Sequence, residues 1–250
     1  MFTYENIEGP RPFLWGHRGA PLLAVENTVA SFQKAFAAGL YGVEFDVQFS
    51  RDGVPFVFHD DDLKRLAGVE MVPSRLLWDQ IKTITIRDPL RPQHGEAHIP
   101  TLEAVFEVIP PEKFINLEVK HPDPLNDRDV MRMVGMLRDH MMHNRTLISS
   151  FQPRHLYQVK HLAPDMALAV LWAGEPSIEA IQQSRQRLSP VMHVPLPWVD
   201  QFDPTLWRVP GSSIAVWGLS GAEDVARCRQ AGVNAIFIDS PKWGDPLSSS

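Results

Sequence analysis

Cysteine is almost absent from this 250-residue chain, which contains only Cys228. A single cysteine cannot form an intramolecular disulfide, so the sequence excludes a disulfide-stabilised secreted domain and favours a reducing compartment. Residues 1–10 carry Glu5 and Glu8, where a signal peptide would have basic residues followed by an apolar run. No apolar run approaches the roughly 18 residues of a membrane span. We therefore expect a cytoplasmic protein without stable membrane insertion.

An excess of positive charge is also lacking. The 24 Lys and Arg residues are outnumbered by 30 Asp and Glu residues, which gives a formal net charge of -6. Nucleic acids and anionic membranes are bound by basic surfaces that release counterions, so neither is an expected partner. Hydrophobic residues make up 44% of the chain and charged residues 22%, close to the globular average. The chain can therefore bury a core, and any anionic ligand must be held by local positive charges.

Short runs rich in Val, Ile and Phe recur along the chain and predict nine strands. These runs span residues 13–17, 42–49, 54–59, 114–120, 146–150, 167–172, 191–196, 214–219 and 235–239. Segments with helical spacing separate most of them and span residues 26–38, 101–109, 127–143, 153–162, 177–187 and 222–231. Alternation of strands and helices predicts an α/β protein with a parallel sheet.

One of the nine predicted strands does not fit a parallel sheet. The turn Ser50-Arg51-Asp52-Gly53 is too short to cross over between parallel strands, so residues 54–59 are expected to run antiparallel to residues 42–49. The other eight runs predict a single (β/α)8 TIM barrel over residues 1–250, a fold of about this length. Residues 60–100, rich in Pro and Gly, are expected to form a small insertion after this hairpin.

Carboxylates gather where two of the predicted strands end, the place where barrel enzymes carry their functional residues. Glu44 and Asp46 are two residues apart on a predicted strand and so point to the same face. Burying both ionised is costly, so a hard divalent cation would explain them, with Glu118 on the next strand as a third ligand. Mg²⁺ or Ca²⁺ is the expected cation, and Mn²⁺ is a third candidate. The alternative is a salt-bridged face neutralised by Arg18 and Lys120.

Two histidines occupy strand ends that the barrel would bring together. His17 ends the first predicted strand and His59 ends the antiparallel one. Two imidazoles can divide the acid–base work of phosphodiester cleavage, one taking a proton from the attacking group and one giving a proton to the leaving oxygen. Arg18 is the candidate for bidentate contact with a phosphate, and Lys120 would add a point charge. Each of the four also has a plainer interpretation, as a structural histidine or a counter-ion.

The order and spacing of these residues resemble the N-terminal signature of the glycerophosphodiester phosphodiesterase family. The matching segments are Leu14-Trp15-Gly16-His17-Arg18-Gly19, Glu26-Asn27-Thr28, Gly42-Val43-Glu44-Phe45-Asp46-Val47, Arg51-Asp52-Gly53 and Val57-Phe58-His59-Asp60. Further matches follow at Ile99-Pro100-Thr101-Leu102, Asn116-Leu117-Glu118-Val119-Lys120, Ser149-Ser150-Phe151, Val216-Trp217 and Asp239-Ser240-Pro241. The resemblance therefore covers nearly the whole chain.

This resemblance implies a PLC-like phosphodiesterase barrel of lipid and glycerol metabolism, which hydrolyses glycerophosphodiesters to sn-glycerol 3-phosphate and an alcohol. It also implies the site residues: His17 and His59 as the acid–base pair, Arg18, Lys120 and Trp217 as substrate contacts, and Glu44, Asp46 and Glu118 as metal ligands. The implied nucleophile is water or the neighbouring glycerol hydroxyl. Residues 60–100 match the insertion that characterises the family.

The chain departs from the family pattern at three places. These are Gly218-Leu219-Ser220, Ile238, and Arg65-Leu66-Ala67-Gly68, which replaces a Thr-rich start of the insertion. The departures leave the predicted metal and acid–base residues in place, and they leave the identity of the leaving alcohol open.

Two other functions remain open from the sequence. One is a lysophospholipase D or sphingomyelinase D type activity on a larger lipid, for which Leu76, Leu77, Trp78 and Ile81 would line an acyl site instead of packing as a small helix on the barrel. The other is a non-catalytic barrel that binds phosphodiesters. A homodimer is expected from three aromatic residues that lie near one another in the sequence, Trp198, Phe202 and Trp207.

Overall fold

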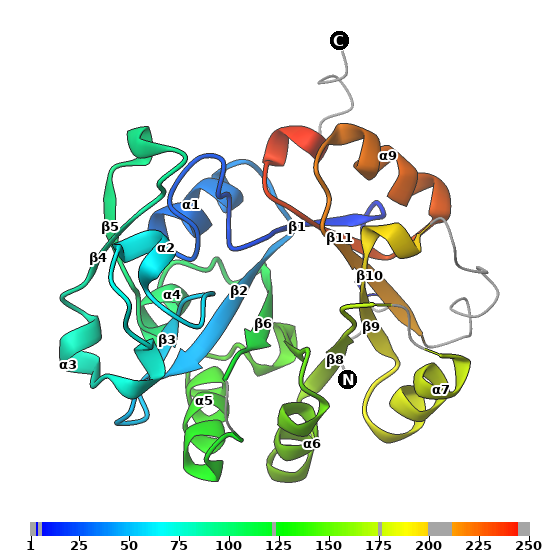
Figure 1. Cartoon of the computed structure of the whole chain (residues 1–250). Coiled ribbons are helices and arrows are strands. Elements are labelled where there is room, and N and C mark those ends of the chain that lie inside the picture. The colour runs from blue at the N-terminus through cyan, green and yellow to red at the C-terminus, as the bar shows by residue number, and fades with distance from the viewer. Residues whose placement is uncertain (1–3, 5–6, 122–123, 175–176, 200–211, 245–250) are drawn as a thin grey trace.

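The computed structural model describes residues 4, 7–121, 124–174, 177–199 and 212–244. Eight parallel strands close into a barrel, because the first pairs with both the second and the last. In spatial order they are β1 (Phe13–Gly16), β2 (Gly42–Phe49), β6 (Phe114–Val119), β7 (Thr146–Ser150), β8 (Ala167–Leu171), β9 (Val191–Pro195), β10 (Ser213–Trp217) and β11 (Ala235–Ile238). The predicted TIM-like barrel is confirmed, and Figure 1 shows helices surrounding its strands.

The antiparallel strand that sequence spacing predicted is also present. It is β3 (Pro55–Val57), which pairs with β2 across a tight turn. Gly53 in this turn has a φ of 76°, a left-handed conformation that glycine adopts without steric cost. Beyond β3, the backbone N–H of Phe58 donates to the carbonyl of Asp46 at 2.9 Å. The hairpin therefore returns His59 to the side of β2 that carries the predicted metal ligands.

Helices connect the barrel strands. They are α1 (Val29–Ala37), α4 (Leu102–Phe106), α5 (Asp127–Asp139), α6 (Pro153–Leu162), α7 (Ile178–Arg187) and α9 (Ala222–Ala231), with short 3₁₀ turns at Pro73–Arg75, Pro92–His94, His143–Arg145, Leu196–Trp198 and Pro241–Gly244. The helix predicted from residue 26 begins later, because Asn27 has a φ of 57° and the Thr28 hydroxyl accepts the Ser31 N–H as an N-cap. The helix predicted to reach residue 143 ends at Asp139.

The insertion lies beside α1 and α4 (Figure 1). It contains α2 (Lys64–Ala67), α3 (Trp78–Ile81), β4 (Thr85–Arg87) and β5 (Glu96–His98), and the two strands pair antiparallel. A separate apolar cluster holds it to the barrel and consists of Val25, Phe56, Phe58, Leu63, Leu66, Leu76, Ile81, Ile86 and Ile99. Trp78 stacks on Phe56 with ring centroids 6.3 Å apart. The small-helix interpretation of residues 76–81 is therefore confirmed.

Two apolar layers form the rest of the core. The larger one lies between the strands and the outer helices, and the smaller one fills the barrel with side chains that include Tyr4, Trp15 and Phe237. His193 on β9 also lies inside, with its Nε2 3.1 Å from the Tyr4 hydroxyl, and burial lowers its pKa to about 3. An imidazole with so low a pKa is neutral at pH 7, so the barrel interior adds no positive charge there.

The structure bears on two expectations about partners, namely membrane insertion and the homodimer. Across the described part of the chain, every helix is too short or too polar to cross a bilayer. Of the three aromatic residues behind the expected homodimer, Trp198 is buried, whereas Phe202 and Trp207 lie outside the described residues. The homodimer therefore stays a prediction.

Candidate active site

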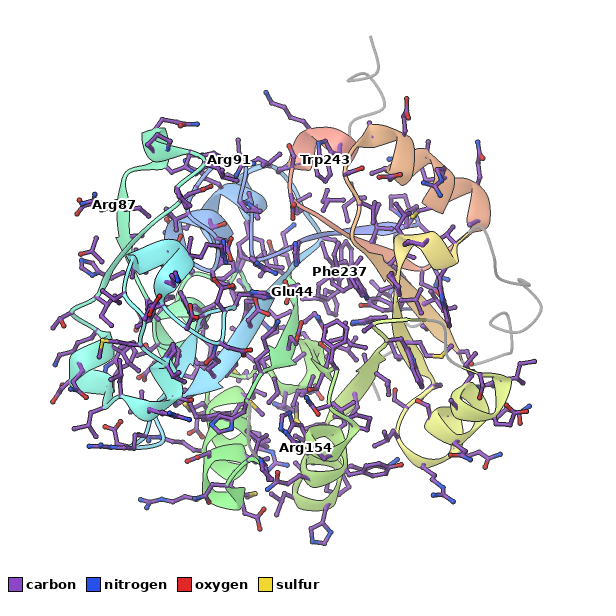
Figure 2. The ribbon with its side chains drawn as sticks, in the orientation of Figure 1. Glu44, Arg87, Arg91, Arg154, Phe237 and Trp243 are labelled. Carbon is purple, nitrogen blue, oxygen red and sulfur yellow. The ribbon has the colours of Figure 1, made fainter. Side chains whose placement is uncertain are left out.

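Polar residues at the carboxyl ends of the strands continue the inward-facing rows of the barrel. Because side chains alternate along a strand, a residue two positions beyond an interior one faces the interior as well. Trp15 is followed at this spacing by His17, and Phe237 by Asp239. A pocket of about 280 Å³ lies at this end of the barrel. Figure 2 shows Glu44 and Phe237, which both line it, near the middle of the molecule.

The structure brings the predicted site residues together. Those that line the pocket are His17, Arg18, Glu44, His59, Glu118, Lys120 and Trp217. The remaining one, Asp46, lies 3.5 Å from both Arg18 and Lys120. The positions of these residues at the strand ends therefore predicted which side chains meet, although they did not predict the partners of the two histidines.

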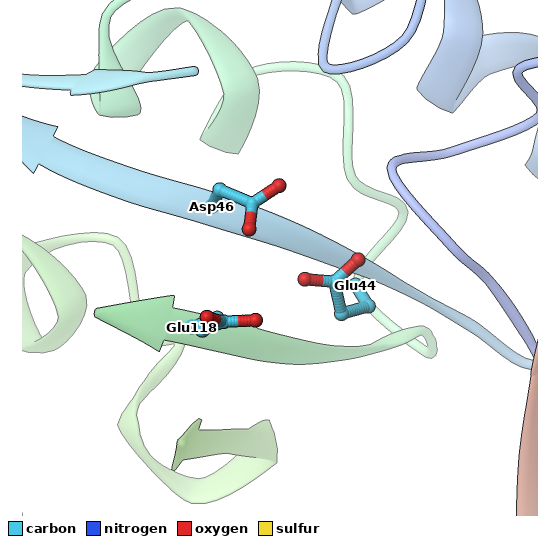
Figure 3. Close-up of side chains that lie close together, drawn as sticks. All are labelled: Glu44, Asp46 and Glu118. Carbon is cyan, nitrogen blue, oxygen red and sulfur yellow. The ribbon is translucent and has the colours of Figure 1, made fainter. Parts of the chain in front are cut away.

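The three predicted metal ligands form one buried cluster (Figure 3). Glu44 and Asp46 extend from β2 and Glu118 from β6, where Glu118 stands opposite Asp46 in the register of the two parallel strands. One carboxylate oxygen of each lies within 4.8 Å of the others. Their exposed fractions are only 4%, 1% and 8%. A compact, buried set of oxygen donors is what a hard divalent cation requires.

Negative charge is crowded in this cluster. Burial and the charges of Asp46 and Glu118 raise the pKa of Glu44 well above its ordinary value. Burial and the charge of Asp46 likewise raise the pKa of Glu118 to about 8. Burial also opposes ionisation of Asp46, but the positive charges of Lys120 and Arg18 outweigh it and hold the pKa of Asp46 below its ordinary range. A divalent cation would relieve this repulsion, so the residues fit a metal site.

Lys120 and Arg18 bring positive charge to the cluster. The Lys120 ammonium is 3.3 Å from the Glu118 carboxylate, and Nε of the Arg18 guanidinium is 3.5 Å from the Asp46 carboxylate. The Arg18 backbone N–H also donates to Glu44 at 3.0 Å. Both residues thus make the counter-ion contacts of the plainer interpretation. Both also line the pocket, where either could meet a substrate oxygen. Their contact with a phosphate stays a prediction.

Each predicted acid–base histidine is paired with an aspartate. Nδ1 of His17 is 2.7 Å from Asp239, and Nδ1 of His59 is 2.7 Å from Asp60. An ionised carboxylate only accepts, so Nδ1 is the donor in each pair and Nε2 is left for other contacts. Both side chains are partly exposed, at 34% and 29%. A histidine held in this way can take up a proton on Nε2 and later release it.

The loop after β1 connects the arginine to the carboxylate cluster through the backbone. Arg18 has a φ of 52° and Gly19 a φ of 89°. The Arg18 carbonyl accepts the Asn27 N–H at 3.0 Å and the Ser31 hydroxyl at 2.9 Å. The Asn27 side-chain amide in turn donates to Asp46 at 2.7 Å. The position of Arg18 therefore depends on the same loop that supports a predicted metal ligand.

Replacing Gly19 with alanine should destabilise this loop by about 1–3 kcal/mol. A Cβ at Gly19 would lie 2.4 Å from the Ser31 hydroxyl oxygen and 2.8 Å from the Ser31 carbonyl carbon, so Ser31 and its bond to Arg18 must shift. Gly39→Ala is the matched control, because Gly39 has a φ of 80° but nothing within 4 Å of an added Cβ. Thermal unfolding should show the larger loss for Gly19→Ala. Equal losses would mean that the backbone conformation alone requires glycine at position 19.

One wall of the pocket is aromatic. Trp217 at the end of β10 meets Phe151 edge to face, with ring centroids 5.7 Å apart and an interplanar angle of 84°. Its indole Nε1 is buried and, within the described ranges, has no hydrogen-bond partner. Trp217 therefore adds an apolar surface to the lining of the pocket, and its contact with a substrate stays a prediction.

Sequence reasoning assigned no role to three residues that support the predicted ones. Asp60 and Asp239 pair with the histidines, and Asn116 lies opposite Glu44 in the strand register. Asn116 lines the pocket, and its buried Oδ1 accepts no hydrogen bond from the part of the chain that the structure describes. A signal was available, because Asn116 is two residues before Glu118 and so faces the same way.

Two departures from the family pattern lie at the site. Gly218 lines the pocket, and the Arg65 guanidinium donates to Asp60 at 2.7 Å. Arg65 is thus one contact away from His59. The third departure, Ile238, is buried on the outer side of the barrel among the core residues that face the helices.

Comparison with known proteins agrees with these observations. The sequence profile of the glycerophosphoryl diester phosphodiesterase family matches residues 17–243. A glycerophosphodiester phosphodiesterase from Caldanaerobacter subterraneus subsp. tengcongensis is 28% identical over 230 residues, which cover 90% of this chain and 93% of that protein. Glycerophosphodiester phosphodiesterase domain-containing protein 4 from Macaca fascicularis is 31% identical over 204 residues, which cover 64% of this chain but 32% of that longer protein.

Solved structures share the barrel. A phosphodiesterase from Oleispira antarctica, in complex with the product sn-glycerol-3-phosphate, has a TM-score of 0.83 and 26% identity, covering 95% of this chain and 96% of that one. A glycerophosphodiester phosphodiesterase from Thermotoga maritima has a TM-score of 0.75 and 26% identity, covering 94% and 97%. Because the profile match begins at His17 and runs past the last barrel strand, the chain is an enzyme of the glycerophosphoryl diester phosphodiesterase family.

Proposed function

We propose that this enzyme hydrolyses glycerophosphodiesters to sn-glycerol 3-phosphate and an alcohol, with a divalent cation held by Glu44, Asp46 and Glu118. The observation that carries the proposal is the pocket itself, which two aspartate-paired histidines and a buried carboxylate cluster share. The two histidines, which can transfer protons, thus lie beside carboxylates that can bind a cation. Cleavage of an anionic diester requires both proton transfer and positive charge. The sn-glycerol-3-phosphate bound to the Oleispira antarctica enzyme supports this substrate class.

The proposed reaction breaks the bond between phosphorus and the leaving alcohol oxygen. Nε2 of one histidine takes the proton of the attacking oxygen, and Nε2 of the other gives a proton to the leaving oxygen. The attacking oxygen belongs to water or to the neighbouring glycerol hydroxyl. In the second case a cyclic phosphate forms first, and water then opens it while the two histidines exchange roles.

The other pocket residues bind and orient the diester. Arg18 and Lys120 hold its phosphate oxygens, and Trp217 with Phe151 packs against the C–H groups of its glycerol. Glu44, Asp46 and Glu118 would hold a divalent cation, which would supply Lewis-acid polarisation of the phosphoryl group. The positive charges of the site compensate the negative charge that the phosphate gains as the attacking oxygen approaches.

The activity on a larger lipid loses three of the four residues that favoured it, and only Leu77 does not pack in or against the apolar cluster of the insertion. Leu76 and Ile81 pack in the apolar cluster of the insertion, and Trp78 stacks on Phe56. These side chains are occupied by the fold, so we prefer a substrate without an acyl chain. A lysolipid remains the comparison substrate for the test below.

Removing divalent cations with EDTA should abolish the release of sn-glycerol 3-phosphate from glycerophosphocholine and other glycerophosphodiesters. Adding back Mg²⁺, Ca²⁺ or Mn²⁺ one at a time should restore it, and the most effective ion identifies the cofactor. Product is measured by a coupled assay for glycerol 3-phosphate. Full activity after EDTA treatment would contradict the role of the carboxylate cluster. Faster choline release from lysophosphatidylcholine than from glycerophosphocholine would favour the larger lipid.

A further inference from the structure

We propose that Arg65, the second residue of α2, is a positioning residue that fixes His59 and Arg18 in one geometry. The inference rests on the proposed function, because it concerns the residues that carry the chemistry there. Arg65 belongs to α2, the first helix of the insertion, and Figure 1 shows this helix outside the barrel. The inference therefore gives the insertion a part in organising the active site.

The Arg65 guanidinium joins two carboxylates, each by two hydrogen bonds. Nε and Nη2 donate to Asp60 at 2.7 Å and 2.9 Å. Nη1 and Nη2 donate to Glu26 at 2.8 Å and 2.7 Å. Paired contacts of this kind fix the relative orientation of the planar groups, which a point charge cannot do. Arg65 thus connects the end of the hairpin with the loop between β1 and α1.

The first carboxylate orients His59. The Asp60 oxygen that Nη2 contacts also lies 2.7 Å from His59 Nδ1. Burial opposes ionisation of Asp60, but the hydrogen bonds from His59 and Arg65 outweigh it and hold the pKa of Asp60 below its ordinary range. Asp60 is therefore an ionised acceptor, and His59 must carry its proton on Nδ1. That leaves Nε2 for the proton transfer proposed above.

The second carboxylate holds Arg18. Glu26 Oε1 accepts a hydrogen bond from Arg65 and another from Arg18 Nη1, the latter at 2.8 Å. Glu26 and Arg18 are only 14% and 17% exposed, so water competes weakly for these contacts. Arg65 thereby acts on one proposed acid–base residue and one proposed phosphate-binding residue at the same time.

Local packing holds Arg65 in place. Leu63 and Leu66 on either side of it are buried in the cluster of the insertion, and Gly68 ends α2 with a left-handed φ of 73°. Arg65 itself is 40% exposed, so its contribution to the stability of the fold is expected to be small. Its effect on the orientation of His59 and Arg18 is expected to be larger. Loss of a residue that hydrogen-bonds to a metal ligand changes activity by about 10–100-fold, and we expect a loss of the same size here.

The test compares Arg65→Met and Arg65→Lys with the wild-type holoenzyme. With glycerophosphocholine as the substrate, kcat of Arg65→Met should fall by about 10–100-fold, and Arg65→Lys should recover part of the loss. Long-range ¹H–¹⁵N NMR of the Mg²⁺-loaded protein should show His59 protonated on Nδ1 in the wild type and a mixture of tautomers in Arg65→Met. Arg138→Met is the matched control. Arg138 also donates two hydrogen bonds to a carboxylate, that of Asp165, and its side chain is about as exposed as that of Arg65.

Each outcome decides the proposal. A folded Arg65→Met variant with wild-type kcat, or with an unchanged His59 tautomer, would overturn it. A lower kcat together with a mixture of His59 tautomers in Arg65→Met, with Arg138→Met unaffected, would support it. If Arg65→Met fails to fold, the same two measurements on Arg65→Lys decide. The tautomer measurement needs no substrate, so it tests the positioning role even if the wild type hydrolyses no glycerophosphodiester, a result that would contradict the proposed function instead.

Discussion

Replacing either His17 or His59 with alanine should lower kcat on glycerophosphocholine by about 10²–10⁴-fold, the usual contribution of a positioned general acid or base. Each imidazole is oriented through Nδ1 by an aspartate, so an alanine leaves no group that can accept or donate a proton at that place. His161→Ala is the control, because His161 is exposed on α6 and away from the pocket. Initial rates with purified variants measure the effect.

Metal binding should survive both histidine substitutions. The carboxylate cluster lies on β2 and β6 and uses no imidazole, so titration calorimetry with Mn²⁺ should give the wild-type affinity. Full activity in either variant would remove that histidine from the acid–base pair. Loss of metal binding together with activity would instead make the histidine a metal ligand. The two measurements thus separate proton transfer from the building of the metal site.

The barrel could be predicted because the sequence patterns that specify its strands and helices are local. Apolar runs of strand length, helices with N-caps and a four-residue turn each depend on neighbours in the sequence. Counting them gave eight barrel strands, and period-two alternation placed Glu44 with Asp46. The sequence also marks the start of α1, because Thr28 is a residue type that caps helices and its hydroxyl accepts the Ser31 N–H. The left-handed turn at Asn27 before it could not be found in this way, since Arg18 and Asp46, two distant residues, support it.

The pairing inside the site was less predictable than its membership. His17 and its partner Asp239 are 222 positions apart, and only closure of the barrel, which pairs β1 with β11, brings them together. Arg65 and Glu26 are 39 positions apart and come from two connections that flank the hairpin. Strand ends can be placed on one face from topology alone, whereas contacts between loops require the three-dimensional path of each loop.

Replacing Glu118 with glutamine should weaken metal binding and lower kcat/KM by more than about 100-fold. Loss of a residue that only hydrogen-bonds to a metal ligand costs up to about 100-fold, and loss of a ligand itself should cost more. Glutamine keeps the size of the side chain but removes a charged ligand, and no other described carboxylate belongs to the cluster besides Glu44 and Asp46. Titration calorimetry and the glycerol 3-phosphate assay measure the two effects. The control is Glu103→Gln, because Glu103 is an exposed residue on α4. Wild-type metal affinity in Glu118→Gln would remove Glu118 from the metal site.

The same substitution should stabilise the metal-free protein at alkaline pH. Burial and Asp46 raise the pKa of Glu118 to about 8, above the ordinary value near 4.3 of the unfolded chain. The folded state therefore binds a proton that the unfolded state has already released, so stability is lost as pH rises from about 4.3 to 8, by up to about 1.4 kcal/mol per pH unit. Glutamine cannot ionise, so this loss should be smaller in Glu118→Gln.

Metal binding should remove this loss of stability at alkaline pH in the wild type. A ligating carboxylate must give up its proton, so the cation stabilises the ionised form of Glu118. At pH 7 the wild type should therefore release protons when it binds Mg²⁺, and it should release fewer at pH 9, where Glu118 is already ionised. Calorimetry in buffers of different ionisation enthalpy counts these protons. If none is released at pH 7, the carboxylates are all ionised without the cation, and repulsion among them cannot be what metal binding relieves. If Glu118→Gln is less stable than the wild type at pH 9 without metal, the ion pair with Lys120 outweighs the cost of burial.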